Sequence, residues 1–250
     1  FNSEPSPQRT PVLVQAGASP VGRAFAAANA EVAFVQGKDA KMLREQVDDL
    51  RRRAAAAGRG AEAVKAIAGL SVATAPSRAE AEDKLEEWLS WVNPDAARAY
   101  YAMMTGVDLA ALDPDSAFAK VTTEGGRTQV ERYRDVSVRE AVADFLRRGM
   151  RELIVTGTPR DAAEAIAAIV DETDLDGFNF TPFVSPGSYV DFAEQVVPEL
   201  QRIGLMRTER TLPTLRERLF GAGNARLPET HPAARHRPGS VTTVADLATT

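Results

Sequence analysis

The segment best suited to chemistry is Gln15-Ala16-Gly17-Ala18-Ser19-Pro20, which follows a short apolar run and precedes a helix-forming stretch. Gly17 allows the backbone to turn tightly against a ligand, and Ser19-Pro20 is a favourable helix start. Free amides and the helix dipole both favour an anion at such a start, and the Ser19 hydroxyl can add a hydrogen bond. The spacing therefore predicts a phosphate cradle, although Ser19 could equally do no more than cap its own helix.

Other reactive side chains are less well placed. The two histidines, His231 and His236, lie in a Pro/Ala/Thr-rich tail that offers no rigid frame for metal ligation or base catalysis. Four charged runs fall on predicted helices, where we interpret them as solvated faces: Asp48-Asp49, Arg51–Arg53, Glu86-Glu87 and Arg147-Arg148. The sequence contains no Ser-His-Asp arrangement, Walker loop or GxGxxG fingerprint, and we assign no catalytic residue and no metal site.

The elements that must position the cradle alternate between β and α. Apolar runs predict strands at 11–16, 32–36, 64–74 (with a glycine interruption) and 177–181, and a short extended segment at 153–155. Capping patterns and apolar periodicity predict helices at 21–30, 39–57, 77–91, from 93 onward, 137–148, 160–171, 189–203 (bent at Pro198) and near 213–220. This alternation predicts parallel strands joined by helical crossovers. Four good strands are half of an eight-stranded (β/α) barrel.

Two stretches do not follow the alternation. The region of about 92–150 contains Asp113-Pro114 and Gly125-Gly126, and we interpret it as a helical insertion before the last strand. It also carries Tyr100, Tyr101, Met103 and Met104, which we expect to pack in a core or in a dimer contact. We predict one α/β domain over residues 1–220 and a disordered tail over 221–250.

Composition excludes several classes of protein. The chain of 250 residues has a net charge of −5 and no cysteine, so disulfides, zinc–thiolate sites and thiol catalysis are absent. Its basic residues are scattered among acidic ones, which argues against a nucleic-acid partner. No apolar run approaches the roughly 20 residues of a membrane span. We expect a cytoplasmic protein with no membrane partner, and the absence of an initiator Met suggests a fragment.

Three spaced motifs resemble the bacterial-luciferase-like flavin-dependent monooxygenases, and in particular the nitrilotriacetate and dibenzothiophene-sulfone monooxygenase group. Residues 11–36 (PVLVQAGASPVGRAFAAANAEVAFVQ) and 69–92 (GLSVATAPSRAEAEDKLEEWLSWV) are similar to consecutive segments of that group. Residues 155–207 carry VTGTPRDAAEAI, DGFNFTP and DFAEQVVPELQRIGL, which resemble its final βα unit. The resemblance covers about residues 10–220 in the right order. It implies the C-terminal half of a luciferase-like (β/α)₈ barrel.

The resemblance also implies site residues. In that family a Gly-Ser-Ser turn holds the FMN phosphate, and the matching positions here are Gly17, Ala18 and Ser19. Ala18 replaces the commoner serine, so one hydroxyl is lost while the backbone amide is kept. Gln15 and Ala16 are expected on the ribityl side of the flavin. The Phe178–Pro182 segment is expected near the flavin ring or the substrate, although Phe178 and Phe180 fit a strand core equally well.

The activity implied by the resemblance is a two-component monooxygenation. A separate NAD(P)H-dependent flavin reductase supplies FMNH2, which reacts with O2 to give a C4a-hydroperoxyflavin that oxygenates a small organic substrate. The family's flavin-facing residues, including a histidine, belong largely to the first half of the barrel.

Three alternatives remain open at this point. The chain could be a non-catalytic half-barrel remnant, or a self-associating module that binds a phosphate-bearing ligand. It could also be a deazaflavin-dependent oxidoreductase of the same superfamily. An open half-barrel has unpaired strand edges, so we expect a homo-oligomer.

Overall fold

A computed structural model of the chain describes residues 4–17, 19–37, 39–123, 125–209 and 211–236. The chain divides into two compact units. The first comprises residues 1–34, 47–66 and 208–250, and the second comprises 35–46 and 67–207. Helix α2 and strand β3 each contribute residues to both units.

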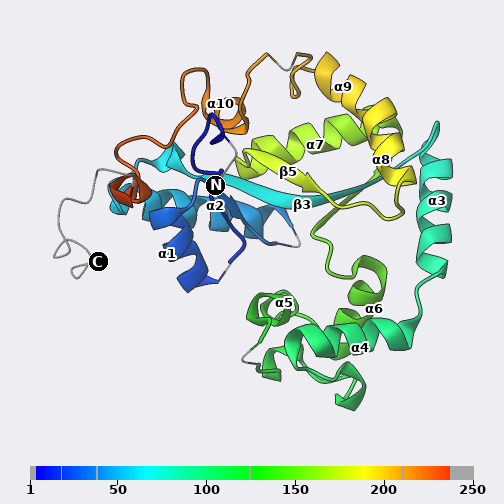
Figure 1. Cartoon of the computed structure of the whole chain (residues 1–250). Coiled ribbons are helices and arrows are strands. Elements are labelled where there is room, and N and C mark those ends of the chain that lie inside the picture. The colour runs from blue at the N-terminus through cyan, green and yellow to red at the C-terminus, as the bar shows by residue number, and fades with distance from the viewer. Residues whose placement is uncertain (1–3, 18, 38, 124, 210, 237–250) are drawn as a thin grey trace. The chain divides into compact units, whose positions relative to one another are not determined.

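The elements follow one another mostly as strand then helix (Figure 1). The strands are β1 (Val14–Gln15), β2 (Val32–Phe34), β3 (Lys65–Thr74), β4 (Leu153–Gly157) and β5 (Gly177–Phe180). The α-helices are α1 (Pro20–Asn29), α2 (Ala40–Ala56), α3 (Arg78–Ser90), α4 (Pro94–Thr105), α5 (Arg127–Glu131), α6 (Val138–Arg148), α7 (Pro159–Thr173), α8 (Gly187–Asp191), α9 (Val197–Arg202) and α10 (Leu215–Phe220). Short 3-10 turns lie at Ala61–Ala63, Leu109–Ala111, Phe118–Lys120 and Pro232–His236.

Strand pairing in the first unit is parallel. Val14 of β1 lies opposite Val32 of β2, and Gln15 lies opposite Ala33. Between the two strands, α1 buries Ala26 and Ala27, and the small side chains let the helix lie close to the strands. We predicted a strand over 11–16, and the paired part is shorter, at Val14–Gln15.

Strand pairing in the second unit is also parallel. Strand β3 pairs with β4 from Leu70 to Thr74 and with β5 from Ile67 to Leu70. The predicted glycine interruption is wrong, because β3 continues through Gly69. The Gly69 amide instead donates to the Glu152 carboxylate at 2.6 Å. Parallel strands with helical connections confirm the predicted α/β class.

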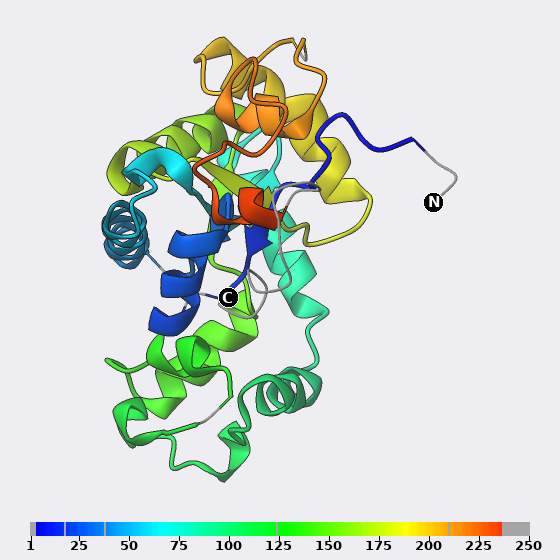
Figure 2. The same cartoon turned by 60° about the vertical axis from the view of Figure 1, so that its left-hand side comes forward.

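The helical segment between α3 and β4 has a core of its own. Its buried residues include Tyr101, Phe118, Tyr133 and Phe145, which meet edge to face in two pairs. Helices α4, α5 and α6 lie together in both ribbon views (Figures 1 and 2). Of the predicted cluster, Tyr101 is buried, whereas Tyr100, Met103 and Met104 are exposed. Of these four residues Tyr101 therefore packs in a core, and the dimer contact of the other three stays a prediction.

Most helix starts follow the capping residues read from the sequence. Ser137 and Glu140 form a complete capping box at α6, and Thr158 with Asp161 forms another at α7. At α3, where the sequence predicts a capping box, the Ser77 hydroxyl accepts from the Glu80 amide and donates to the Glu80 carboxylate. Before Pro198, where we predicted a bend, the structure has a π-helical turn over Phe192–Val196, in which the Val197 amide donates to the Phe192 carbonyl. Proline has no amide hydrogen to continue the regular ladder, which accounts for the irregular turn here.

The predicted disordered tail requires a correction. Residues 221–236 are folded in the first unit, with Leu227, His231 and Ala234 buried. The Ala225 carbonyl also accepts a hydrogen bond from Arg216. A stretch rich in Pro and Ala can therefore be ordered when it buries apolar side chains and one of its carbonyls accepts a hydrogen bond from a buried cation. Residues 237–250 lie outside the described residues.

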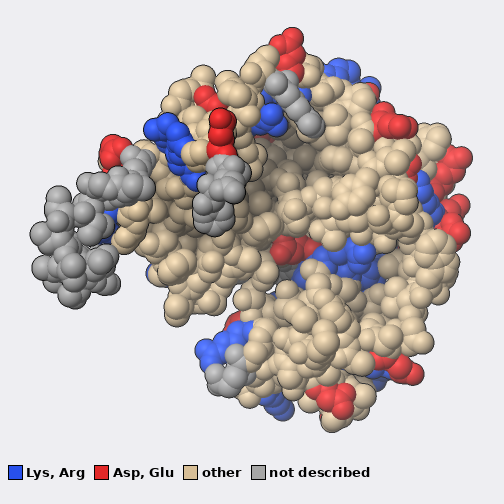
Figure 3. All heavy atoms as spheres, in the orientation of Figure 1, with Lys and Arg blue, Asp and Glu red and all other residues tan. Residues whose placement is uncertain are grey.

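Charged side chains of both signs are dispersed over the visible face (Figure 3). In the described part of the chain, no helix combines the length and apolar character that crossing a bilayer requires. Nor do the described acidic and histidine side chains gather in any group of three or more suited to a metal ion.

Candidate functional site

The predicted cradle lies between the end of β1 at Gln15 and the start of α1 at Pro20. Ser19 has extended backbone angles and is the N-cap of α1. Its Oγ accepts a hydrogen bond from the Gly22 amide at 3.1 Å, and its carbonyl accepts from the Arg23 amide at 2.8 Å. The capping interpretation of Ser19 is therefore confirmed. The hydroxyl proton is not used in accepting this bond, so it stays available for donation to a ligand.

Two glycines bring the turn and the first turn of the helix into close contact. A Cβ on Gly22 would lie 2.4 Å from the Gly17 carbonyl oxygen, and a Cβ on Gly17 would lie 3.0 Å from the Gly22 Cα. Both positions therefore require glycine for this close backbone approach. The Gln15 side-chain amide also lies against Gly17, with Nε2 2.9 Å from the same Cβ position. The structure thus brings Gln15, Gly17 and Ser19 together, while Ala18 lies outside the described residues.

Replacing Gly22 with alanine should lower the free energy of unfolding by about 1–3 kcal/mol, because the new methyl group meets backbone atoms that cannot move independently. Urea denaturation followed by circular dichroism measures this loss. Gly187→Ala is the matched control, since a Cβ at Gly187 has nothing within 4 Å. Equal stability of the two variants would mean that the Gly17–Gly22 contact is not needed.

The cradle offers amides and a hydroxyl to a ligand. Pro20 has no amide hydrogen, and the Gly22 amide is used by Ser19. In the described residues no hydrogen bond is found for the amides of Ser19 and Val21, and both residues are exposed. Two free amides at a helix start, together with the dipole, are suited to an anion.

The basic side chain in the first turns of α1, Arg23, is paired within the protein. Its Nε donates to Asp49 at 2.7 Å, and Arg53 binds the same carboxylate at 2.9 Å. Burial acts to raise the pKa of Asp49, but the hydrogen bonds from Arg23 and Arg53 hold it below its ordinary value. Asp49 is thus an ion-pair partner between α1 and α2, and its interpretation as part of a solvated helix face is wrong.

A second polar group, which sequence reasoning missed, lies beside β3 in the second unit. Glu152 precedes β4, accepts from the Gly69 amide and lies close to the buried Arg132. Burial raises the pKa of Glu152 to about 7, although the Gly69 amide and Arg132 act to lower it. The only available signal was a carboxylate next to an apolar strand, because Gly69 and Arg132 are distant in sequence.

Side chains of the helical segment also donate hydrogen bonds to the backbone carbonyls of Arg151 and Glu152. Arg132 donates to the Arg151 carbonyl at 2.7 Å, and Arg148 donates to the Glu152 carbonyl at 2.6 Å. Arg148 also pairs with Asp144, which accepts from the Tyr133 hydroxyl at 3.0 Å. Burial raises the pKa of Tyr133, so the phenol stays protonated as a donor. The network ties α6 and α5 to the start of β4.

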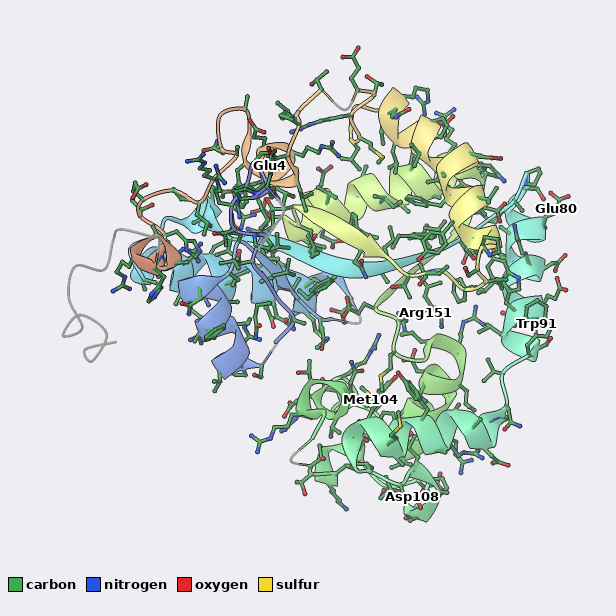
Figure 4. The ribbon with its side chains drawn as sticks, viewed as in Figure 1. Glu4, Glu80, Trp91, Met104, Asp108 and Arg151 are labelled. Atoms are coloured by element: carbon green, nitrogen blue, oxygen red, sulfur yellow. The ribbon has the colours of Figure 1, made fainter. Side chains whose placement is uncertain are left out.

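An aromatic cavity of about 310 Å³ lies between α3, α4, α6 and the segment after β5. Trp88 stacks on Phe183 with ring centroids 5.3 Å apart, and the Arg151 guanidinium lies 4.3 Å from the Phe183 ring centroid. Figure 4 shows Arg151 on the connection between α6 and β4, and Trp91 at the end of α3. A cation on an aromatic wall is suited to a planar or anionic organic group.

In the Phe178–Pro182 segment, Phe178 and Phe180 are half-buried on alternate positions of β5, and neither belongs to the buried core. Phe180 stacks on Phe192 at 4.4 Å and contacts Tyr189 at 5.5 Å, whereas Asn179 between the two phenylalanines is exposed. The placement of this segment near a flavin or substrate stays a prediction.

The two histidines lie in ordered structure, which their sequence context did not predict. His231 is buried in the first unit, and burial together with the nearby Arg59 lowers its pKa. His236 ends the 3-10 turn Pro232–His236 and is exposed. The prediction that both lack a rigid frame is therefore wrong for His231.

Comparison with known proteins identifies the family. The model of the luciferase-like monooxygenase family matches residues 1–176. This chain belongs to the luciferase-like monooxygenases. The long-chain alkane monooxygenase of Geobacillus thermodenitrificans (strain NG80-2) is 40% identical over 235 residues, which cover 94% of this chain and 50% of that protein. The dimethyl-sulfide monooxygenase of Hyphomicrobium sulfonivorans is 38% identical and covers 95% of this chain and 51% of its own length.

A solved relative has a similar fold over almost all of this chain. The crystal structure of a riboflavin lyase, with modified FMN and the substrate riboflavin, superposes with a TM-score of 0.88 at 41% identity. The match covers 95% of this chain and 53% of that chain. Nitrilotriacetate and dibenzothiophene-sulfone monooxygenases are also among the relatives, so the resemblance stated from the sequence is confirmed. The chain spans about half the length of the relatives it matches.

Proposed function

We propose that this chain is the C-terminal half of a flavin-dependent monooxygenase and that its first unit holds the cofactor phosphate. The observation that carries the proposal is the cradle, where two glycines in contact place the Ser19 hydroxyl and two free amides at a helix start. Membership of the luciferase-like family and the FMN in the riboflavin lyase structure support the same choice of cofactor.

The cradle residues fit a phosphate by their chemistry. The amides of Ser19 and Val21 would donate to phosphate oxygens, as would the Ser19 hydroxyl proton, while Gly17 allows close approach of the ligand. Gln15, whose side chain lies against Gly17, would face the adjoining ribityl chain. Ala18 would contribute its amide only. When bound, reduced FMN supplies the activation of O2 that oxygenation of an organic substrate needs.

Two partners follow from this function. A separate NAD(P)H-dependent reductase would supply FMNH2, as the sequence resemblance implies, and the protein's own residues would bind and orient the cofactor. The relatives at 38–41% identity are named for a long-chain alkane, dimethyl sulfide and riboflavin. Because these substrates differ so widely, we propose a small organic substrate and no single compound.

We further propose that residues 1–220 form half of a (β/α)₈ barrel, with residues 92–150 as an insertion. Parallel pairing in both units and coverage of about half of each relative support this organisation. The flavin-facing residues of the other half would complete the active site. A half-barrel without activity, which self-associates through unpaired strand edges, is the competing function, and cofactor binding distinguishes the two.

FMN should bind to this chain with measurable affinity, and Ser19→Ala should weaken that binding by about tenfold, because a hydrogen bond to a charged group contributes about 1.5–3 kcal/mol. Titration followed by flavin fluorescence measures both. Riboflavin has no phosphate, so its affinity should be the same for the wild type and for Ser19→Ala.

The matched control is Ser77→Ala, which removes another serine N-cap, on α3, whose hydroxyl accepts from the Glu80 amide. Both substitutions remove one helix cap, at a cost of about 1 kcal/mol in stability, but Ser77→Ala should leave FMN affinity unchanged. Equal loss of FMN and riboflavin affinity in Ser19→Ala would contradict the assignment of the phosphate to the cradle. Folded protein that binds no FMN would favour the non-catalytic half-barrel.

A further inference from the structure

A basic cavity of about 120 Å³ lies in the first unit, away from the cradle. Its wall includes Glu31, Arg59, Arg216, Asn224, Arg226 and His231. Glu31 directly precedes β2, whereas Ser19 follows the end of β1. Because β1 and β2 are parallel, the start of β2 and the end of β1 lie at opposite ends of the strand pair. The basic cavity and the cradle are therefore separate places in the same unit.

The charges around the basic cavity do not balance. Arg216 binds Glu31 through two guanidinium nitrogens, at 2.7 and 3.1 Å, and so neutralises the carboxylate of the wall. Among the described residues, neither Arg59 nor Arg226 forms an ion pair. Arg59 donates instead to the carbonyls of Ala27 and Ala63, at 2.9 and 3.3 Å. Two positive charges thus remain around the cavity, in a chain whose net charge is −5.

One neutral polar group of the wall, His231, adds a donor. His231 is 3% exposed, and its Nε2 forms no hydrogen bond of normal geometry among the described residues, the Asn29 carbonyl being an acceptor near the ring. Burial, Arg59 and Arg216 lower the pKa of His231, against the opposing effects of Glu31 and the Asn29 carbonyl. Its Nδ1 accepts from the Ala233 amide at 3.1 Å. A neutral imidazole whose Nδ1 accepts carries its hydrogen on Nε2, where it can donate.

We propose that the basic cavity binds a small inorganic oxyanion such as phosphate or sulfate. The uncompensated charges of Arg59 and Arg226 supply the attraction, and an oxyanion would accept from guanidinium groups in their preferred geometry. The volume of about 120 Å³ is well below the roughly 300 Å³ at which pockets for organic ligands begin. The bound ion would link the loop after α2 to residues 226–231.

Calorimetric titration of the whole chain with inorganic phosphate at constant ionic strength tests the proposal. We expect saturable binding that Arg226→Gln weakens by about tenfold, as loss of one charge-assisted bond implies. Arg226 is exposed, so this variant should fold. Arg98→Gln, which removes the same charge from an exposed pair with Asp95, is the control and should titrate like the wild type.

Two further arms separate the basic cavity from the cradle. Ser19→Ala should leave this phosphate site intact, and the imidazole nitrogen resonances of His231 should shift on titration in wild type and Ser19→Ala alike. If Arg226→Gln binds phosphate as tightly as the wild type and the His231 resonances do not move, the proposal is overturned. Since Ser19→Ala tests the cradle alone, failure of one site is distinguishable from failure of the other.

Discussion

Replacing Arg216 with methionine should lower the free energy of unfolding by about 3–5 kcal/mol, the cost of leaving a buried charge without its partner. The side chains of Arg216 and Glu31 are 1% and 4% exposed. Arg216 donates to both oxygens of Glu31 and to four carbonyls, those of Gln8, Thr10, Pro11 and Ala225. Methionine fills similar volume but donates to none of these acceptors, and of them Glu31 and the Gln8 carbonyl keep another donor, the amides of Leu13 and Thr10.

Urea denaturation followed by circular dichroism measures the loss, with Arg218→Met as the control. Arg218 is two residues away on α10, is exposed, and donates to one carbonyl, that of Leu212, so its replacement should change stability by about 0.5 kcal/mol or less. A double variant, Arg216→Met with Glu31→Met, should recover much of the loss, because an apolar pair can replace a buried ion pair. A small effect of Arg216→Met alone would mean that the pair is not buried in solution.

The sequence alone indicates one member of this ion pair, Glu31. Glu31 stands in an Ala-rich apolar stretch directly before a predicted strand, which is an unusual place for a lone carboxylate. Its partner lies 185 residues further along the chain, and no local pattern connects the two. The same distance explains the incorrect tail prediction, because the order of residues 221–236 depends on contacts such as that between Arg216 and the Ala225 carbonyl.

Local signals were sufficient for the turn and the helix start that the cradle would use. Ser19-Pro20 predicted the start of α1, and the structure has Ser19 as N-cap and Pro20 as the first helical residue. Gly17 predicted a tight turn, and it lies in contact with Gly22. These features depend on neighbouring residues, so sequence spacing fixes them. The role of Gly22 was missed because glycine within a helix indicates nothing until its partner is known.

Long-range groups of the second unit could not be predicted in the same way. Glu152 and Gly69 are 83 residues apart, and the bond between them depends on the parallel pairing of β3 with β4. Arg132 lies in the region of about 92–150, whose irregular sequence predicted an insertion but no contact with β3 or β4. Because tertiary contacts place the Glu152 carboxyl, they also raise its pKa, and the pH dependence of stability measures that change.

Wild-type stability should fall as pH rises from 5 to 8, and Glu152→Gln should remove about 2–3 kcal/mol of that fall. The folded-state pKa of Glu152 is raised to about 7 from an ordinary 4.5, so the folded chain binds this proton more tightly than the unfolded chain does. The stabilisation is fully present below pH 4.5 and is lost as pH rises through about 7.

Urea denaturation at pH 5 and pH 8 measures the effect as the difference between variant and wild type, in which the opposite contribution of His231 cancels. Glutamine keeps an oxygen to accept from the Gly69 amide, so the two proteins should be equally stable at pH 5. At pH 8 the variant should be the more stable, because no carboxylate is ionised beside β3. If wild type and variant change in parallel between the two pH values, Glu152 is already ionised at pH 5, and Arg132 outweighs its burial.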